Sequence, residues 1–156
     1  MAAQPNEQEM RERVIKLVFR GDTEKFEEFI NALRADLPSG TGVVLRGSAV
    51  TGERWQDGAP FDAEGRGTSD VDLTLIGEEV INLYNSAGFY IPLIHTKPLS
   101  DKDPDIAPGL NPLREKLQRI AGRPVNIQAT RDFVRFVREE LIGQPHLTII
   151  ARKEAV

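Results

Sequence analysis

Two stretches near the N-terminus carry apolar residues at the spacing of a helix. In the first these residues are Met10, Val14, Leu17 and Val18, and in the second Phe26, Phe29, Ile30 and Leu33. Each set falls on one face of a helix. Gly21 separates the two stretches, and Asp22 or Thr23 is suited to cap the second helix with its side-chain oxygen. We therefore expect two amphipathic helices between about residues 7 and 37.

The rest of the chain alternates between strand and helix patterns. A short apolar run beside glycines, typical of a buried strand, covers residues 43–45. Polar and apolar side chains alternate over residues 70–75, which predicts a strand with one polar face. Further strands are predicted at residues 89–94, 124–128 and 147–151, and further helices at 78–86, 113–120 and 133–141. Pro92 places its strand at an edge or a bulge, because proline has no amide hydrogen to donate.

The order of these elements predicts the fold class. Strands and helices are mixed along the chain and no linker divides it, so we expect one α+β (mixed α/β) domain over residues 1–156. Its N-terminal helices would cover about residues 7–37 and its core about residues 42–152. The helices would pack mainly on one face of a mixed sheet and leave the other face open for a site.

A polar stretch over residues 51–69, rich in glycine, is the longest predicted loop in the first half of the chain. Loops of this length in a compact domain are uncommon and often functional. This one either covers or shapes a substrate site, or it is a simple insertion. Trp55 within it either stacks on a base or anchors the loop on the core, and we favour the anchor.

Composition narrows the classes of function. The 156 residues carry a formal net charge of −4 and no long cluster of Lys and Arg, so we do not expect binding to bulk nucleic acid. The lack of cysteine excludes disulfides, thiolate catalysis and cysteine-based zinc sites, and fits a reducing compartment. The polar N-terminus does not resemble a signal peptide, and no apolar run is long enough to span a membrane. We therefore expect a cytoplasmic protein.

The strongest chemical signal is a pair of carboxylates that follows a Gly-Ser turn. Asp70 and Asp72 lie two residues apart on a predicted strand, so their side chains point to the same face. Two like charges this close repel each other, and either water solvates them on an exposed strand face or a cation neutralises them. Mg²⁺ or Mn²⁺ takes oxygen ligands from both carboxylates and phosphates. Gly47 permits a tight backbone approach, and the Ser48 hydroxyl can donate a hydrogen bond to a phosphate.

Arginines near the turn add to this signal. Arg46 adjoins Gly47 and is our candidate for a charge-assisted contact with a phosphate of a nucleotide. Arg54 and Arg66 are also near enough in sequence to make such a contact. The residues alone do not decide among the three.

Residues 46–49 (Arg-Gly-Ser-Ala), followed by residues 69–73 (Ser-Asp-Val-Asp-Leu), resemble the signature of the DNA polymerase beta-like nucleotidyltransferase superfamily. The resemblance covers about residues 42–77 and suggests a minimal member. It implies a nucleotidyltransferase fold in which the Gly-Ser turn holds the phosphates of a nucleoside triphosphate and the two aspartates bind Mg²⁺ or Mn²⁺. The implied reaction transfers a nucleoside monophosphate to a hydroxyl on a small molecule, an RNA end or a protein.

The chain departs from the family pattern at two points. Twenty-one residues separate Ser48 from Asp70, a longer gap than in minimal members. The family also places a third carboxylate on a later strand, where this chain has Asn126. An amide is neither a charged ligand nor a base, so Asn126 weakens the case for a metal that activates the attacking hydroxyl.

Three functions follow from these patterns. The first is an active nucleotidyltransferase, and the second is a catalytically impaired nucleotide-binding or partner-binding module, for example antitoxin-like, that retains the fold. The third is a plain interaction domain without a nucleotide site. A homodimer or a partner chain could complete the base and acceptor pockets, and the second function predicts a partner such as a toxin-like protein. Other candidates are His95, which we expect to be structural, and Asp101, Asp103 and Asp105, which we expect to be solvated, although one of them could replace the missing carboxylate.

Overall fold

The structure is a computed structural model and describes residues 6–54 and 56–153. Its strands are β1 (Gly42–Arg46), β2 (Val71–Ile76), β3 (Phe89–Ile91), β4 (His95–Thr96), β5 (Val125–Thr130) and β6 (His146–Ile150). Its α-helices are α1 (Glu7–Phe19), α2 (Thr23–Asp36), α3 (Ser48–Thr51), α4 (Glu78–Ile81), α5 (Asn111–Ala121) and α6 (Phe133–Phe136). The short 3₁₀ turns η1 (Ser86–Gly88) and η2 (Pro108–Leu110) and the π-helical turn η3 (Val137–Leu141) complete the described elements.

The helix ends follow local chemistry. Asn6 caps α1 by accepting a hydrogen bond from the backbone amide of Glu9, and Asp22 caps α2 in the same way through Lys25. Helix α5 ends at Gly122, which adopts the left-handed conformation with φ of 67°. In the described ranges no helix is long and apolar enough to cross a membrane.

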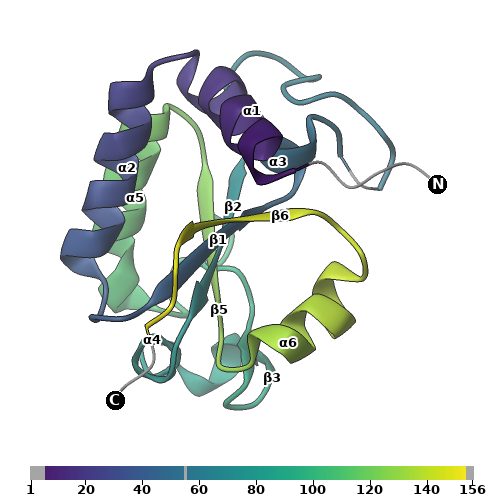
Figure 1. Cartoon of the computed structure of the whole chain (residues 1–156). Helices are drawn as coiled ribbons and strands as arrows, with labels where there is room; N and C mark the ends of the chain where they lie inside the picture. The colour runs from purple at the N-terminus through teal and green to yellow at the C-terminus, as the bar shows by residue number, and fades with distance from the viewer. Residues whose placement is uncertain (1–5, 55, 154–156) are drawn as a thin grey trace.

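The strands form one mixed sheet in the order β3-β4-β5-β2-β1-β6 (Figure 1). Strands β2 and β5 are parallel, and each of the other neighbouring pairs is antiparallel. The parallel pair needs a long crossover, and α5 lies on that crossover directly before β5. The expectation of an α+β fold with a mixed sheet is therefore confirmed.

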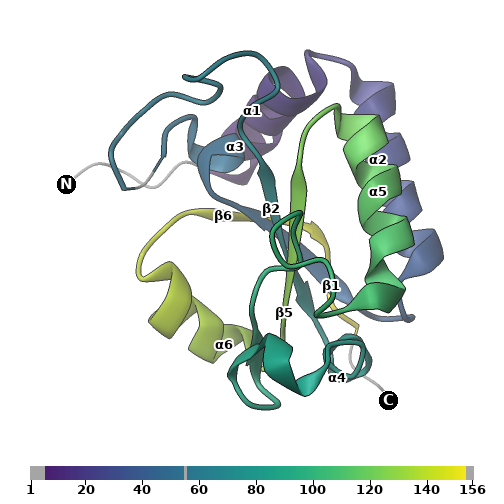
Figure 2. The same ribbon diagram turned by 180° about the vertical axis from the view of Figure 1, so that it is seen from behind.

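The hydrophobic core lies between the sheet and helices α1, α2 and α5, which cover the same face (Figures 1 and 2). Alternate residues of the central strands point into it, and the largest of these are fully buried: Val43, Leu45, Val71, Leu73, Leu75, Val125 and Ile127. Because side chains alternate along a strand, the residues between them must face the other side of the sheet. That side carries the polar residues of the central strands.

Helix α6 and η3 cover part of this second face. Phe136 of α6 is fully buried, and its ring lies 5.7 Å from the ring of His95 on β4. The open face that we expected is therefore closed over its middle, because Phe136 and Leu141 bury their side chains against it. The end of this face near residues 70–72 lies beside a pocket, and the candidate site is at this end.

Three elements differ from the sequence expectation. The helix predicted at residues 78–86 is shortened to α4, and residues 48–51 form the helix α3, which is too short to show periodicity. The strand predicted at residues 89–94 is a hairpin of β3 and β4. Pro92 lies in the turn, where its missing amide hydrogen is harmless, and β3 is the edge strand that proline predicted.

Candidate functional site

The turn after β1 brings the backbone against a carboxylate. Gly47 has φ of 85° and ψ of −159°, a combination that is essentially restricted to glycine. A Cβ atom at this position would lie 2.9 Å from Oδ2 of Asp72. The glycine is therefore required both by the backbone conformation and by the close approach of Asp72 to the turn. Ser48 follows as the first residue of α3 and lines the adjoining pocket.

The register of the sheet sets Asp72 between two polar neighbours. Asp72 on β2 pairs with Arg46 on β1 and with Asn126 on β5. Asp70 lies directly before β2, and the side-chain amide of Asn126 reaches both carboxylates. Asn126 Nδ2 donates to Asp70 Oδ2 at 2.7 Å and to Asp72 Oδ1 at 3.2 Å. The amide of Asn126 therefore bridges the two acids.

The two carboxylates repel each other. Burial raises the pKa of Asp72, and the negative charge of Asp70 raises it further. Arg46 and the Asn126 amide act in the opposite direction without cancelling the rise. The ionised pair is therefore under strain in the protein alone, and a cation between the two groups would relieve it.

Side chains on the second face of the sheet hold Arg46 beside the acids. One of its guanidinium nitrogens donates to Gln128 Oε1 at 2.9 Å, and its Cζ atom lies 6.0 Å from the centre of the Phe136 ring. Its Nε is buried and has no hydrogen-bond partner among the described residues. Arg46 is also one of the residues that line the pocket, which places a positive charge beside it.

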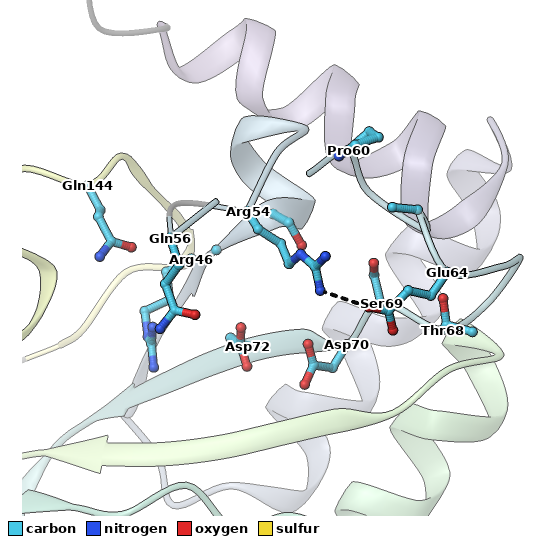
Figure 3. A pocket seen from close by; sticks show the side chains of 13 residues that line it. Arg46, Arg54, Gln56, Pro60, Glu64, Thr68, Ser69, Asp70, Asp72 and Gln144 are labelled. Atoms are coloured by element: carbon cyan, nitrogen blue, oxygen red, sulfur yellow. Dashed lines mark hydrogen bonds and ion pairs between the residues drawn. The ribbon is translucent and has the colours of Figure 1, made fainter. Parts of the chain in front are cut away.

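A pocket of about 310 Å³ opens over the two acids (Figure 3). Its lining joins the residues already described to a second group, which is Arg54, Gln56, Pro60, Ala63, Glu64, Thr68, Ser69 and Gln144. All of this second group except Gln144 belong to the stretch over residues 51–69. The long loop therefore shapes the candidate site, and it is more than a distant insertion. The sequence offered no signal for Gln144, which approaches from the segment after η3.

The pocket carries a small negative excess among its described lining residues. Arg46 and Arg54 face Glu64 and the pair Asp70 and Asp72. Arg54 already forms two ion pairs. Its Nη1 lies 3.2 Å from Glu64 Oε1, and its Nε lies 3.3 Å from Asp57 Oδ1. An anionic ligand would therefore need a cation to enter this pocket with favourable electrostatics.

Several sequence candidates lie elsewhere. Arg66 is exposed and is not part of the described lining of the pocket, and Trp55 lies outside the described residues. His95 is fully buried, with its Nδ1 2.5 Å from the Thr130 hydroxyl, as expected of a structural residue. Asp101 pairs with Arg114 at 2.7 Å, and neither Asp103 nor Asp105 is among the lining residues. All three aspartates are exposed, as expected of solvated residues, and none of them is in the described lining of the pocket.

Asp70 and Asp72 are the neighbouring carboxylates of the pocket floor that could ligate a divalent cation. They share one hydrogen-bond donor, the side-chain amide of Asn126, and carboxylate and phosphate oxygens are the ligands that Mg²⁺ takes. Within residues 6–54 and 56–153, no group of three or more His, Cys, Asp or Glu could hold a metal ion. A cation at this site would therefore depend on ligand phosphates for most of its charged oxygen ligands.

Comparisons with known proteins do not identify a relative of this chain. The motif resemblance therefore rests on the residues quoted for it, and what it implies about activity belongs to the proposal that follows. Searches with the whole chain against family models, curated proteins and solved structures found no match.

Proposed function

We propose that this protein binds a nucleoside triphosphate with Mg²⁺ or Mn²⁺ and transfers its nucleoside monophosphate to a hydroxyl acceptor. The observation that carries the proposal is the contact between the Gly-Ser turn and the acid pair. Gly47 has the conformation and the clearance that only glycine allows, and the atom that requires this clearance is Oδ2 of Asp72. A plain surface turn would have no need of such a contact with a strained carboxylate.

The proposal assigns a role to each residue at the pocket floor. Asp70 and Asp72 would hold the cation, which when bound neutralises phosphate charge and orients the phosphates. Ser48 would donate its hydroxyl to a phosphate oxygen, and Arg46 would give a charge-assisted hydrogen bond from the neighbouring strand. Transfer would form a bond between the acceptor oxygen and the α-phosphorus while the bond to the leaving pyrophosphate breaks. The acceptor proton would pass to solvent, because Glu64 of the described pocket lining is paired with Arg54 and the two aspartates would hold the cation.

Direct measurement of binding and transfer tests this proposal. The protein is titrated with Mg²⁺ complexes of ATP, GTP, CTP and UTP by calorimetry, and then incubated with labelled triphosphates and candidate acceptors. Asp70→Asn and Asp72→Asn should each abolish transfer and weaken, without eliminating, the binding that depends on the metal. Asp36→Asn is a matched control, because Asp36 is a carboxylate in an exposed ion pair, 3.9 Å from Lys116. Absence of binding to every triphosphate would refute the proposal.

A second candidate function follows from Asn126. Its side-chain amide donates hydrogen bonds to both acids and cannot act as a base. This favours a nucleotide-binding or partner-binding module that does not catalyse transfer. Such a module would bind a triphosphate with micromolar affinity and release no pyrophosphate. Efficient turnover by the wild-type protein, with no gain from Asn126→Asp, would rule it out.

A further inference from the structure

A buried guanidinium lies behind the pocket wall and joins three parts of the chain. The side chain of Arg123, just before β5, is only 2% exposed. It donates to Asp62 Oδ1 at 2.8 Å and to the backbone oxygen of Ser69 at 3.0 Å, and its other terminal nitrogen contacts the Leu17 oxygen of α1 at 3.4 Å. Its Cζ also lies 4.6 Å from the centre of the Phe61 ring. Arg123 therefore ties the loop to both the helical layer and the sheet.

Asp62 forms hydrogen bonds that join two parts of the loop over residues 51–69. Its Oδ1 accepts from the backbone amide of Ser69 at 2.9 Å and its Oδ2 from that of Gly67 at 3.2 Å, while its own amide donates to Ser69 Oγ at 2.7 Å. Burial acts to raise the pKa of Asp62, but its bonds to Arg123, Ser69 and Gly67 outweigh burial and lower that pKa. Asp62 is therefore a carboxylate whose two oxygens both face donors.

These bonds converge on the residue before Asp70. Ser69 receives contacts from both Asp62 and Arg123, and it is joined directly to Asp70 by the chain. Arg123 lies three residues before Asn126, the partner that Asp70 and Asp72 share. Resting on the proposed function, we propose that Asp62 and Arg123 are positioning residues, which fix Asp70 against Asn126 and thereby set the affinity of the site for the metal-bound nucleotide.

The variant Asp62→Asn tests this directly. An amide accepts at one end only, so its NH₂ group must face a donor, either the Gly67 amide or the pair formed by Ser69 and Arg123. Asp70 should then lose its fixed place. We expect Mn²⁺ affinity, measured by calorimetry, to fall by about 10–100-fold, as is usual when a group that orients a metal ligand is lost. Arg123→Lys is the second variant, because it keeps the buried charge but cannot reach all three partners at once.

Two readouts separate positioning from general destabilisation. In the Asp70→Asn background, Asp62→Asn should cost less than about twofold further affinity, because its effect passes through Asp70. The side-chain amide signals of Asn126 in ¹⁵N–¹H NMR spectra report the position of Asp70 without any metal. They should move in Asp62→Asn and Arg123→Lys, while those of the exposed Asn31 stay in place. Asp36→Asn should change neither readout.

Each outcome decides between the two proposals. Movement of the Asn126 signals together with non-additive affinity losses supports the positioning role. Unchanged Asn126 signals in both folded variants, or fully additive losses, overturn it. If the wild type binds neither Mn²⁺ nor Mg²⁺-triphosphate while the Asn126 signals still move, the proposed function fails and the positioning of Asp70 by Asp62 and Arg123 stands.

Discussion

The variant Gly47→Ala tests the contact on which the proposed function depends. The native φ of 85° and ψ of −159° lie in a region that costs an alanine about 1–3 kcal/mol. For a chain of this size, 1 kcal/mol corresponds to a shift in Tm of about 2–4 °C, so backbone strain alone lowers the Tm by roughly 2–12 °C. The new Cβ would also stand 2.9 Å from Asp72 Oδ2, closer than such atoms approach, so the carboxylate must move.

Displacement of Asp72 gives this variant a second expected effect. The carboxylate would leave its place beside Asn126, and metal affinity should fall by about 10–100-fold, as for other disturbed ligand geometries. Thermal unfolding followed by circular dichroism and titration with Mn²⁺ measure the two effects separately.

Two glycines provide controls for Gly47→Ala. Gly143 has a similar φ of 83°, and an added Cβ there would meet nothing within 4 Å, so Gly143→Ala should lose stability without losing metal affinity. Gly109 has open space and no positive φ, so Gly109→Ala should change neither. The reasoning is refuted if Gly47→Ala unfolds at the same temperature as wild type, or if its Mn²⁺ affinity matches that of Gly143→Ala.

Three further predictions concern the second face of the sheet. The raised pKa of Asp72 means that, without metal, its contribution to stability is greatest at low pH and is lost as the pH rises through that pKa, above the ordinary value of 3.8. Asp72→Asn should therefore flatten this part of the stability profile in urea titrations at several pH values, and an unchanged profile would contradict the assignment. Asn126→Asp should add a third like charge, lower the Tm of the metal-free protein at neutral pH and increase Mn²⁺ affinity in calorimetry; a fall in affinity would show that the amide orients the acids better than a carboxylate. Phe136→Ala should cost about 3–5 kcal/mol of unfolding free energy in urea, because the ring is fully buried, and a cost below about 1 kcal/mol would mean that α6 does not hold this face.

The sequence alone determined the parts of the fold that depend on local pattern. The period-2 alternation over residues 70–75 predicted both the strand and the shared face of Asp70 and Asp72, because side chains alternate along any extended chain. Gly47 likewise predicted a tight backbone approach at the turn, since glycine adopts conformations that other residues avoid. Helical spacing likewise predicted α1 and α2 without knowledge of their partners.

Only the tertiary structure decided what surrounds the acid pair. Asn126 reaches both carboxylates because β5 pairs with β2 in a register that sets Asn126 opposite Asp72, fifty-four residues away in the chain. The loop over residues 51–69 lines the pocket because Arg123, sixty-one residues beyond Asp62, is buried against it. Such contacts join segments whose local sequence patterns do not indicate that they meet, since burial and strand register are set by the packing of the whole core.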